Sequence, residues 1–392
     1  MTSRRAAGVA GSATLSSIDL VRSMQRQGRN VFSFSERPKP PVAAVERARS
    51  ALEEPWSAFY TDSAGLIDLR EAVAARATSS FSRTIDPESE VLVTVGAKEA
   101  IFSCLLATVD PGDEVLITDP AWVSYEPCIQ LVGATAVRVP LHATSDGFQL
   151  RASDLEERVS SRSKLVILNS PHNPTGMVLD MTSLADISAV VAEHDLMVIS
   201  DECYEAFVFD GNVHVSIASL PDMFERTVSI STSSKAFNMF GWRVGWAIGP
   251  SALIQPMLQV HQNIVGCAPS HSQAGVTTAL LQEDSIMENV LPIFQSSRDV
   301  LLDLINEIPG VTCHKPHGAY FLFPDISGTG IADDRLADFL LQDAGVHVMP
   351  GRVFGPRGAG FVRLTFSSHP EHAREGGVKL QRALHEASPT SS

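Results

Sequence analysis

The sequence predicts an α/β protein with a large domain, built on a mostly parallel sheet flanked by helices, and a smaller α+β domain. Its 392 residues exceed the usual size of one hydrophobic core, so two domains are expected. Short, continuous apolar runs alternate with helical stretches through the middle of the chain, as in parallel sheets covered on both faces. After about residue 285 this alternation gives way to a long helix and shorter strands.

The strands of the large domain follow from the apolar runs in chain order. They are predicted at Val91–Val95, Val115–Thr118, Leu165–Asn169, Leu196–Ser200, Thr227–Ser231 and Val244–Ile248. A helix from about Lys98 to Thr108 follows the first strand, and an amphipathic helix at about Thr182–His194 separates two later ones. This order of strand, helix and strand implies parallel pairing with helices on both faces.

The smaller domain is predicted from a long helical stretch that runs to Ile308. Short strands follow at Ala319–Phe323, Val346–Met349 and Val362–Phe366. We expect residues 1–45 to form an N-terminal arm and part of the small domain, 46–285 the large ligand-binding domain, and 286–392 the small C-terminal domain. The residues before Ser16 are small and polar, so we expect them to be loosely structured.

Composition excludes several classes of partner. The net charge is −15, from 30 Lys+Arg and 45 Asp+Glu, which argues against nucleic acid or an anionic membrane as the main partner. The apolar runs are far shorter than the roughly 20 residues that a membrane span needs. The cysteines are scattered, with no C-x-x-C pair, which fits a reduced, cytoplasmic protein without a disulfide framework or metal site: Cys104, Cys128, Cys203, Cys267 and Cys313.

Residues able to do chemistry directly follow the predicted strands. Ligands bind in open α/β sheets beyond the carboxyl ends of the strands, so these positions share one crevice. They are Gly96, Ala97 and Lys98 after the first strand, Asn173, then Asp201 and Tyr204, and finally Thr232, Ser234, Lys235 and Arg243.

This set of residues suits pyridoxal 5′-phosphate (PLP). The backbone N–H groups at the helix start after Gly96, nearby hydroxyls and the guanidinium of Arg243 can hold a phosphate. A lysine amine such as Lys235 can form a Schiff base with an aldehyde. A carboxylate such as Asp201 can pair with a protonated ring nitrogen and keep the ring electron-withdrawing.

Five segments in order resemble the signatures of fold-type I PLP enzymes, the class I/II aminotransferases. These segments are Tyr-Thr-Asp-Ser-Ala-Gly-Leu-Ile-Asp-Leu-Arg-Glu (60–71), Asn-Pro-Thr-Gly (173–176), Asp-Glu-x-Tyr (201–204), Ser-Ser-Lys-Ala-Phe-Asn-Met-Phe-Gly-Trp-Arg-Val-Gly (233–245) and Phe-Val-Arg-Leu-Thr-Phe (361–366). The resemblance covers nearly the whole chain. It implies a PLP-dependent aminotransferase that acts on an amino acid and a 2-oxo acid.

The resemblance also implies roles at the cofactor ring. Lys235 would hold the cofactor and then move the proton between the substrate Cα and the cofactor C4′. Asp201 would pair with the pyridine nitrogen, Asn173 and Tyr204 would hydrogen-bond the phenolic oxygen, and Trp122 would stack on the ring. Asp201, Tyr204 and Lys235 are therefore the predicted catalytic residues.

The phosphate and the substrate carboxylate have their own predicted partners. The resemblance implies that Arg363 clamps the α-carboxylate in a bidentate pair. It also implies that Tyr60 reaches the phosphate of the neighbouring subunit, so a homodimer is expected. The other phosphate-binding residues would be Gly96, Ala97, Thr232, Ser234 and Arg243, and Lys98 is also predicted to be among the cofactor-binding residues.

A set of three residues, Ser12, Thr14 and Lys98, resembles one found in the bacterial aspartate/prephenate aminotransferase subgroup. There, residues matching Ser12, Thr14 and Lys98 bind a distal carboxylate, which suits two hydroxyls and an ammonium. The substrate-side segment departs from the subgroup's Gly-Glu-Pro-Asp-Phe, because Ser35-Glu36-Arg37-Pro38-Lys39-Pro40 stands there. Ser35 adds a side chain near the substrate, and the new cations Arg37 and Lys39 could meet an anionic substrate or face solvent.

Plainer interpretations stay open at this point. Taken singly, Lys235 and Arg363 could be surface residues, Asp201 a helix cap, Trp122 plain core, and Ser12, Thr14 and Lys98 solvated. Extra acid–base groups could come from His172, His271 or His317, although each is more often structural or solvated.

Two other functions are weighed against aminotransfer. The same fold and lysine can run elimination or β/γ-replacement, for example on an S-adenosylmethionine-like substrate, or an oxygen-dependent oxidation, and the altered 35–40 segment motivates this alternative. A PLP-binding regulator would need a DNA-binding domain, for which residues 1–45 leave no room.

Overall fold

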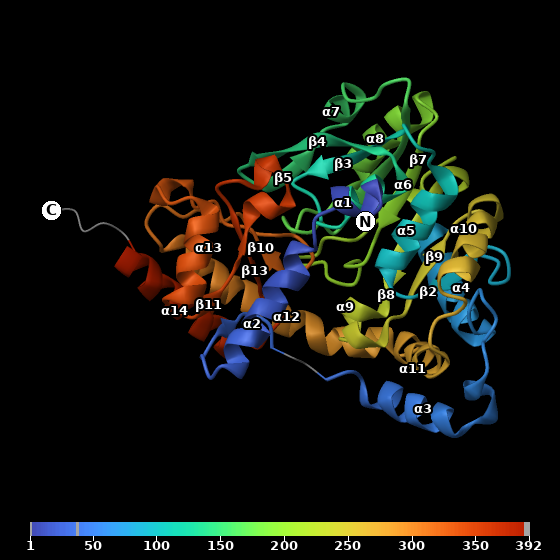
Figure 1. Cartoon of the computed structure of the whole chain (residues 1–392), viewed down its shortest axis with the longest axis horizontal. Coiled ribbons are helices and arrows are strands. Elements are labelled where there is room, and N and C mark those ends of the chain that lie inside the picture. Colours follow the sequence, from blue (N-terminus) through green and yellow to red (C-terminus); the bar gives the residue numbers. More distant parts are fainter. Residues whose placement is uncertain (1, 37–38, 388–392) are drawn as a thin grey trace.

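The computed structural model describes residues 2–36 and 39–387 and has an eight-stranded sheet at its centre (Figure 1). In spatial order its strands are β2 (Val91–Thr94), β9 (Gly245–Ile248), β8 (Thr227–Thr232), β7 (Met197–Asp201), β6 (Ser163–Asn169), β3 (Glu114–Asp119), β4 (Thr135–Thr144) and β5 (Gly147–Leu150). The five strands from β8 to β4 are parallel, and β2, β9 and β5 pair antiparallel at the two ends. The predicted α/β class is therefore confirmed.

Helices cover both faces of this sheet. Along β6, Leu165 and Ile167 pack into one core with α5 (Ala97–Thr108), α6 (Tyr125–Val132) and α10 (Ser251–Ile264). Val166 and Leu168 point to the other face, into a core with α8 (Met181–Glu193) and α7 (Ala152–Glu156). This alternation explains why the strand is apolar at every position from Leu165 to Leu168.

Strand register brings the chemically active loops to one edge. Asn169 pairs with Asp201 in the β6–β7 ladder, and Asp201 pairs with Ile230 in the β7–β8 ladder. Three strands thus end at nearly the same level, and β8 leads directly into the short helix α9 (Ser233–Ala236), which carries Lys235. The sheet therefore sets the positions of the loops that follow each strand.

Three further helices pack together at the β2 end of the sheet. They are α3 (Val42–Glu53), α4 (Ile67–Phe81) and α11 (Ser270–Leu280). Side chains of α4, including Leu69 and Val73, share a core with Val91 and Val93 of β2.

The C-terminal elements form a smaller α+β unit. A three-stranded antiparallel sheet has β13 (Val362–Thr365) between β10 (Phe321–Leu322) and β12 (Met349–Pro350). The helices α12 (Glu283–Asn306), α13 (Asp333–Gln342) and α14 (Pro370–Ala387) accompany it. The N-terminal strand β1 (Phe32–Ser33) pairs with β11 (Val346–His347), so the segment before residue 45 lies with these elements. The domain boundaries themselves stay a prediction.

The N-terminal arm differs from the expectation of a loose segment. It forms α1 (Arg4–Gly8), which lies beside α6, and α2 (Ala13–Arg26) (Figure 1). Val21 and Met24 of α2 are buried against Val31 and Leu341. The expectation of a loose segment before Ser16 was wrong for residues 4–8 and 13–15, which are helical, and α2 is anchored by residues after Ser16 on a surface some 300 residues away in the chain.

The β4–β5 hairpin was also missed, because its residues are mixed in burial and give no continuous apolar run. Within residues 2–36 and 39–387, no helix combines the length and the apolar character needed to cross a bilayer.

Candidate active site

The amine of Lys235 lies close to two aromatic rings. Its Nζ is 5.4 Å from the centre of the Tyr204 ring and 4.8 Å from that of Phe240. Burial lowers the pKa of Lys235 to about 8, and the charges of Arg363 and Arg243 act in the same direction. A sizeable fraction of the amine is therefore uncharged near neutral pH, as a nucleophilic lysine requires.

The carboxylate of Asp201 ends strand β7 and is only 5% exposed. Burial raises its pKa, while hydrogen bonds from Cys203 and Tyr125 and the charge of Lys235 oppose the rise. The Tyr125 hydroxyl donates to Oδ2, and the backbone N–H of Cys203 donates to Oδ1 over 3.2 Å. Each carboxylate oxygen thus has a donor that favours the ionised form.

Arg363 and Asn173 are joined although they are 190 residues apart. Arg363 Nη1 donates to Asn173 Oδ1 over 2.8 Å, and the guanidinium lies between the rings of Phe321 and Phe354. Arg363 is 8% exposed, and burial lowers its pKa to about 10, so it stays charged near neutral pH. Its buried Nε has no hydrogen-bond partner among the described residues. A buried, incompletely paired guanidinium is suited to binding a carboxylate.

A small cradle forms where α5 begins. Gly96 has φ +79°, and a Cβ there would come within 2.4 Å of Arg243 Nη2. Gly245 also lies close to the start of α5, since a Cβ on Gly245 would be 2.7 Å from the backbone nitrogen of Ala97. Because neither glycine carries a side chain, the Arg243 guanidinium and the start of α5 can lie this close to the backbone.

The pairing of β8 with β9 places the hydroxyls of Thr232 and Ser234 beside this cradle. Thr232 pairs with Gly245 in the β8–β9 ladder, which places it beside the start of α5. Thr232 Oγ1 accepts the backbone N–H of Ser234 and lies 3.0 Å from its Oγ. The structure therefore brings together the predicted phosphate-binding residues Gly96, Ala97, Thr232, Ser234 and Arg243.

Trp122 and Lys98 are neighbours, whereas Tyr60 stands apart. Lys98 Nζ is 5.2 Å from the centre of the Trp122 ring. Tyr60 is 90% exposed, and no hydrogen bond or ring contact holds it to another residue of the described chain. Within one chain, Tyr60 is thus not tied to the predicted phosphate site.

The predicted substrate residues divide into two groups. A cavity of about 720 Å³ opens between α2, β1 and the small sheet, and Thr14, Ser35 and Arg363 are among the residues that line it. Ser35 Oγ is bonded to Thr365 Oγ1 at 2.7 Å and to Ser367 Oγ at 3.0 Å, whereas the buried Thr14 Oγ1 has no partner in the described residues.

The other two members of the predicted distal pocket lie elsewhere. Ser12 is the N-cap of α2, and neither it nor Lys98 lines this cavity. Lys39 is exposed, and Arg37 lies outside the described residues.

Comparison with known proteins decides the family. The model of the class I and II aminotransferases matches residues 28–378. The chain belongs to this family. Family members generally use PLP, and the aminotransfer hypothesis is confirmed over the alternative reactions.

Relatives with assigned names fit the predicted subgroup. An aspartate aminotransferase of Pyrococcus abyssi is 37% identical over 348 residues, covering 88% of this chain and 89% of that protein. A protein of Aquifex aeolicus described as a probable aspartate/prephenate aminotransferase is 34% identical over 83% of this chain and 84% of its own. The structure of a Thermus thermophilus aspartate aminotransferase with maleate superposes with a TM-score of 0.91, at 31% identity, over 98% of this chain and 99% of that one.

The histidines of this aminotransferase do not add an acid–base group beside Lys235. His172 is fully buried, with Nε2 3.0 Å from Thr118 Oγ1 and Nδ1 2.8 Å from Thr175 Oγ1. Burial lowers its pKa to about 3, so it stays neutral at physiological pH. His271 lies in the first turn of α11, and His317 lies 4.0 Å from Asp146.

Sequence reasoning missed three aromatic side chains of the site. Tyr125 bonds Asp201, Phe240 lies beside Lys235, and the Tyr320 ring meets the Tyr204 ring edge-on at 5.2 Å. Tyr125 could have been found, because it lies one helical turn after Trp122. Phe240 lies in the 233–245 segment that carries the resemblance, whereas Tyr320 carries no such signal, since only the tertiary fold brings it to Tyr204.

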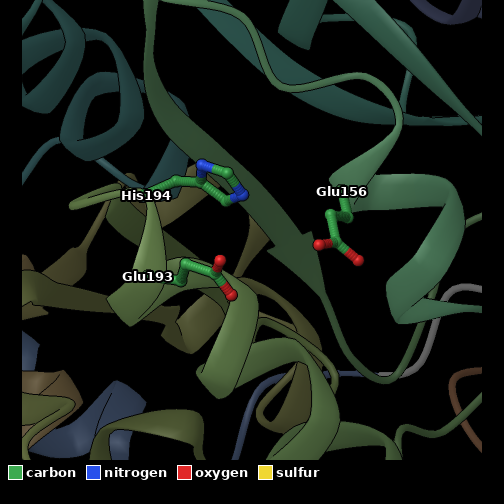
Figure 2. Close-up of side chains that lie close together, drawn as sticks. All are labelled: Glu156, Glu193 and His194. Carbon is green, nitrogen blue, oxygen red and sulfur yellow. The ribbon is translucent and has the colours of Figure 1, made fainter.

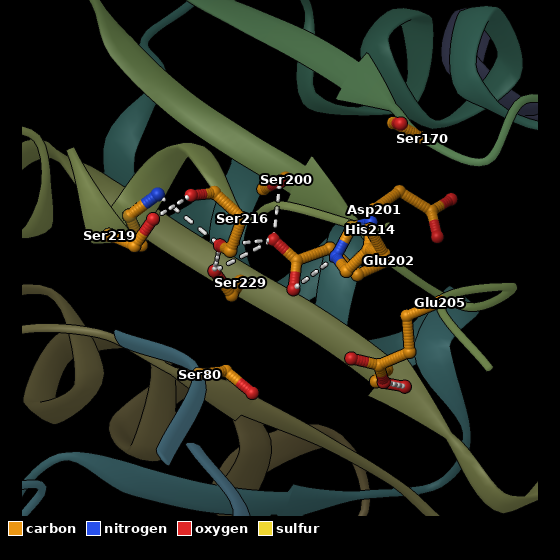
Figure 3. Close-up of polar contacts among 12 residues, drawn as sticks. Ser80, Ser170, Ser200, Asp201, Glu202, Glu205, His214, Ser216, Ser219 and Ser229 are labelled. Atoms are coloured by element: carbon orange, nitrogen blue, oxygen red, sulfur yellow. Dashed lines mark hydrogen bonds and ion pairs between the residues drawn. The ribbon is translucent and has the colours of Figure 1, made fainter. Parts of the chain in front are cut away.

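A second polar network lies behind Asp201 (Figure 3). Glu202 points away from the Asp201 side and accepts hydrogen bonds from Ser200, Ser216 and Ser229. Its other oxygen lies 3.5 Å from His214 Nε2, and although burial opposes it, this carboxylate raises the pKa of His214. Figure 3 shows the two adjacent carboxylates directed apart, so the network supports the loop and does not face the amine.

A cluster of side chains of the kinds that bind metal ions lies far from this crevice. Glu156, Glu193 and His194 place ligand atoms within 4.8 Å of one another, on α7 and at the end of α8 (Figure 2). Both glutamates are exposed, and such clusters are common on surfaces, so we assign no metal to it. The expectation of a metal-free enzyme stays a prediction.

Proposed function

We propose that this aminotransferase binds PLP through Lys235 and moves the amino group of an acidic amino acid to a 2-oxo acid. The observation that carries the proposal is the partly buried amine of Lys235, which lies against the rings of Tyr204 and Phe240, has its pKa lowered to about 8, and feels the charges of Asp201 and Arg363. The three groups offer an attachment point, a partner for a ring nitrogen and a clamp for a carboxylate.

The residues present fit PLP at its phosphate end. The Gly96 cradle has backbone N–H groups at a helix start, two hydroxyls and the Arg243 guanidinium, all suited to a dianion. A side chain at Gly96 or Gly245 would close the space, which supports a cradle shaped for a compact group. Lys98 extends the positive charge toward Trp122, the predicted stacking partner of the ring.

The chain's own residues have distinct tasks in this mechanism. When bound, PLP withdraws electrons from the substrate and so weakens its Cα–H bond. Lys235 would be the attachment point for PLP, and its Nζ would carry the proton of the substrate Cα. Asp201 would pair with the ring nitrogen, and Tyr204 and Asn173 would hydrogen-bond the phenolic oxygen. Arg363 orients the substrate through its α-carboxylate.

An acidic substrate is supported by the relatives and by the cavity. The relatives include enzymes named for aspartate, and the Thermus structure contains a dicarboxylate. Thr14 offers a buried, unpaired hydroxyl in the cavity that reaches Arg363, and Ser35 lines the same space. We propose that Thr14 binds the distal carboxylate, and that Ser12 and Lys98, which do not line this cavity, assist it as the sequence predicts.

A homodimer completes the proposed site. Tyr60 and the adjacent Phe59 are exposed aromatic residues on a segment pinned by Gln273, which donates to Thr61 and accepts the N–H of Leu66. A rigid, exposed tyrosine is suited to reaching the phosphate of a partner subunit. Tyr60→Phe should weaken PLP binding without dissociating the dimer, which can be measured by absorbance and by light scattering.

The attachment of PLP is tested by reduction and peptide mapping. Purified protein is mixed with PLP, reduced with borohydride and digested, and the modified peptide is identified by mass spectrometry. The proposal predicts modification at Lys235 in the wild type and none at this peptide in Lys235→Arg. Modification spread over surface lysines, with no preference for Lys235, would contradict it.

A further inference from the structure

We propose that Tyr125 is a positioning residue that holds the Asp201 carboxylate toward the cofactor ring and fixes Trp122 against it. The inference rests on the proposed function, because it assumes that Asp201 meets the ring nitrogen of PLP. Tyr125 belongs to none of the motifs that identify the family, and its role follows from its contacts.

The first contact is the hydrogen bond to Asp201. Tyr125 is 1% exposed and begins helix α6, with its hydroxyl directed at Asp201 Oδ2. The other oxygen, Oδ1, is held by the backbone N–H of Cys203. These two donors, on different oxygens and from different elements, fix the plane of the carboxylate. The Cys203 side chain also favours the ionised form of Asp201, and the Tyr125 hydroxyl can be removed without changing that residue.

The second contact is with Trp122, one helical turn earlier. The two rings meet edge to face, with centroids 5.3 Å apart and an interplanar angle of 79°. Edge-to-face pairs of this kind are favourable beyond the area they bury. One side chain therefore touches both the proposed partner of the ring nitrogen and the proposed stacking partner of the ring face.

The hydrogen bond has a chemical purpose because Asp201 is buried. Burial favours the neutral acid, whereas pairing with a protonated ring nitrogen requires the carboxylate. A donor on Oδ2 stabilises the charged form. Burial, reinforced by the Asp201 charge, raises the pKa of the Tyr125 hydroxyl far above its ordinary value, so the hydroxyl remains a donor over the whole working range.

Tyr125→Phe isolates the hydrogen bond, because the ring against Trp122 remains. Without the donor, the pKa of Asp201 should rise, so the carboxylate is lost at a higher pH as the solution is acidified. We expect the acid limb of kcat/KM, and the pH below which PLP affinity falls, both to move upward by about one pH unit. At a pH where Tyr125→Phe, but not the wild type, has lost the Asp201 carboxylate, the kcat of the variant should be about tenfold lower, with little change in KM for the amino acid.

Two further variants separate positioning from simple packing. Ile129→Val alters a fully buried residue of the same helix without touching Asp201, and it should leave both pH profiles in place. Tyr125→Leu removes the ring as well as the hydroxyl, and it should lower PLP affinity further than Tyr125→Phe, because Trp122 loses its neighbour.

The decisive comparison is made in an Asp201→Ala background. PLP dissociation constants are measured by cofactor absorbance across pH for Tyr125→Phe, Asp201→Ala and the double variant. If Tyr125 acts through Asp201, adding Tyr125→Phe to Asp201→Ala should change nothing further. An equal loss in both backgrounds, with no pH shift in the single variant, would overturn the inference while Asp201 keeps its role. Full PLP affinity and activity in Asp201→Ala would overturn the proposed function itself.

Discussion

The two sides of the crevice are built in different ways. The side formed by the central sheet carries Lys235, Asp201 and Gly96 directly after three strands, at positions that the strand register fixes. The side formed by α2 and the small sheet carries Thr14, Ser35 and Arg363 on segments that meet only in the folded chain. The first side is expected to set the chemistry, and the second to choose the substrate.

Because of this difference, a substitution should have different consequences on the two sides. On the sheet side, a displaced strand end would move several functional groups at once. On the α2 side, a substitution such as Ser35 changes a local contact with Thr365 and Ser367 and leaves the sheet untouched. The predictions below test this division, starting with the largest expected effect.

Lys235→Ala should abolish the chemistry of the sheet side. Removing the attachment point and proton carrier should lower the rate of amino transfer by at least about a thousandfold. The fold should persist, because removing a buried amine removes a desolvated group. Steady-state kinetics and thermal melting test both statements, and a residual rate within tenfold of wild type would place the proton carrier elsewhere.

Arg363→Lys tests the residue at which the two sides meet. A lysine keeps the charge but loses the planar fork and the bond to Asn173, so KM for the amino acid should rise by roughly 10- to 100-fold. The effect on kcat should be smaller, because Lys235 is untouched. An unchanged KM would show that the α-carboxylate binds to another group.

Thr14→Val tests the α2 side alone. Valine has nearly the same shape but lacks the hydroxyl, which is buried and unpaired among the described residues. If Thr14 binds the distal carboxylate, KM for aspartate should rise by about tenfold, while an uncharged amino donor is unaffected. A purely structural Thr14 would give the opposite pattern, with an unchanged KM and a more stable fold.

His172→Asn should act on stability and leave the chemistry in place. The folded pKa of His172 is lowered to about 3 from an ordinary value of 6.5, so between these values the unfolded chain binds more protons. The stability of the wild type should therefore fall as pH drops from about 6.5 toward 3, and the variant should lose less over that window. Chemical denaturation at several pH values measures the difference, and parallel curves would contradict the assignment.

The sheet side could be predicted from the sequence to a large extent. Strands such as Leu165–Asn169 are continuous apolar runs, and Asn173, Asp201 and Lys235 follow such runs closely. Parallel pairing then places these residues at one edge by geometry alone. The spacing of Tyr125 from Trp122 was the one local signal for it, and its partner Asp201 is 76 residues away in the chain.

The α2 side could be predicted only in part. Thr14, Ser35 and Arg363 do share a cavity, but Ser12 and Lys98 do not line it. The residues before Ser16 were expected to be loose because they are small and polar, whereas α2 is anchored by Val21 and Met24, which pack with Leu341. Specificity therefore rests on tertiary packing, where sequence patterns carry the least information.

The most direct test of the central claim is the half-reaction of the PLP-loaded protein without an acceptor. L-Aspartate, L-glutamate and an uncharged amino acid are added separately, and the absorbance of the bound cofactor is followed. The account predicts that both acidic amino acids convert the cofactor to its pyridoxamine form, and that Lys235→Ala does not catalyse the conversion. A cofactor band that ignores both acids while the uncharged amino acid converts it would contradict the proposed acidic substrate, and a protein that takes up no PLP would contradict the site as a whole.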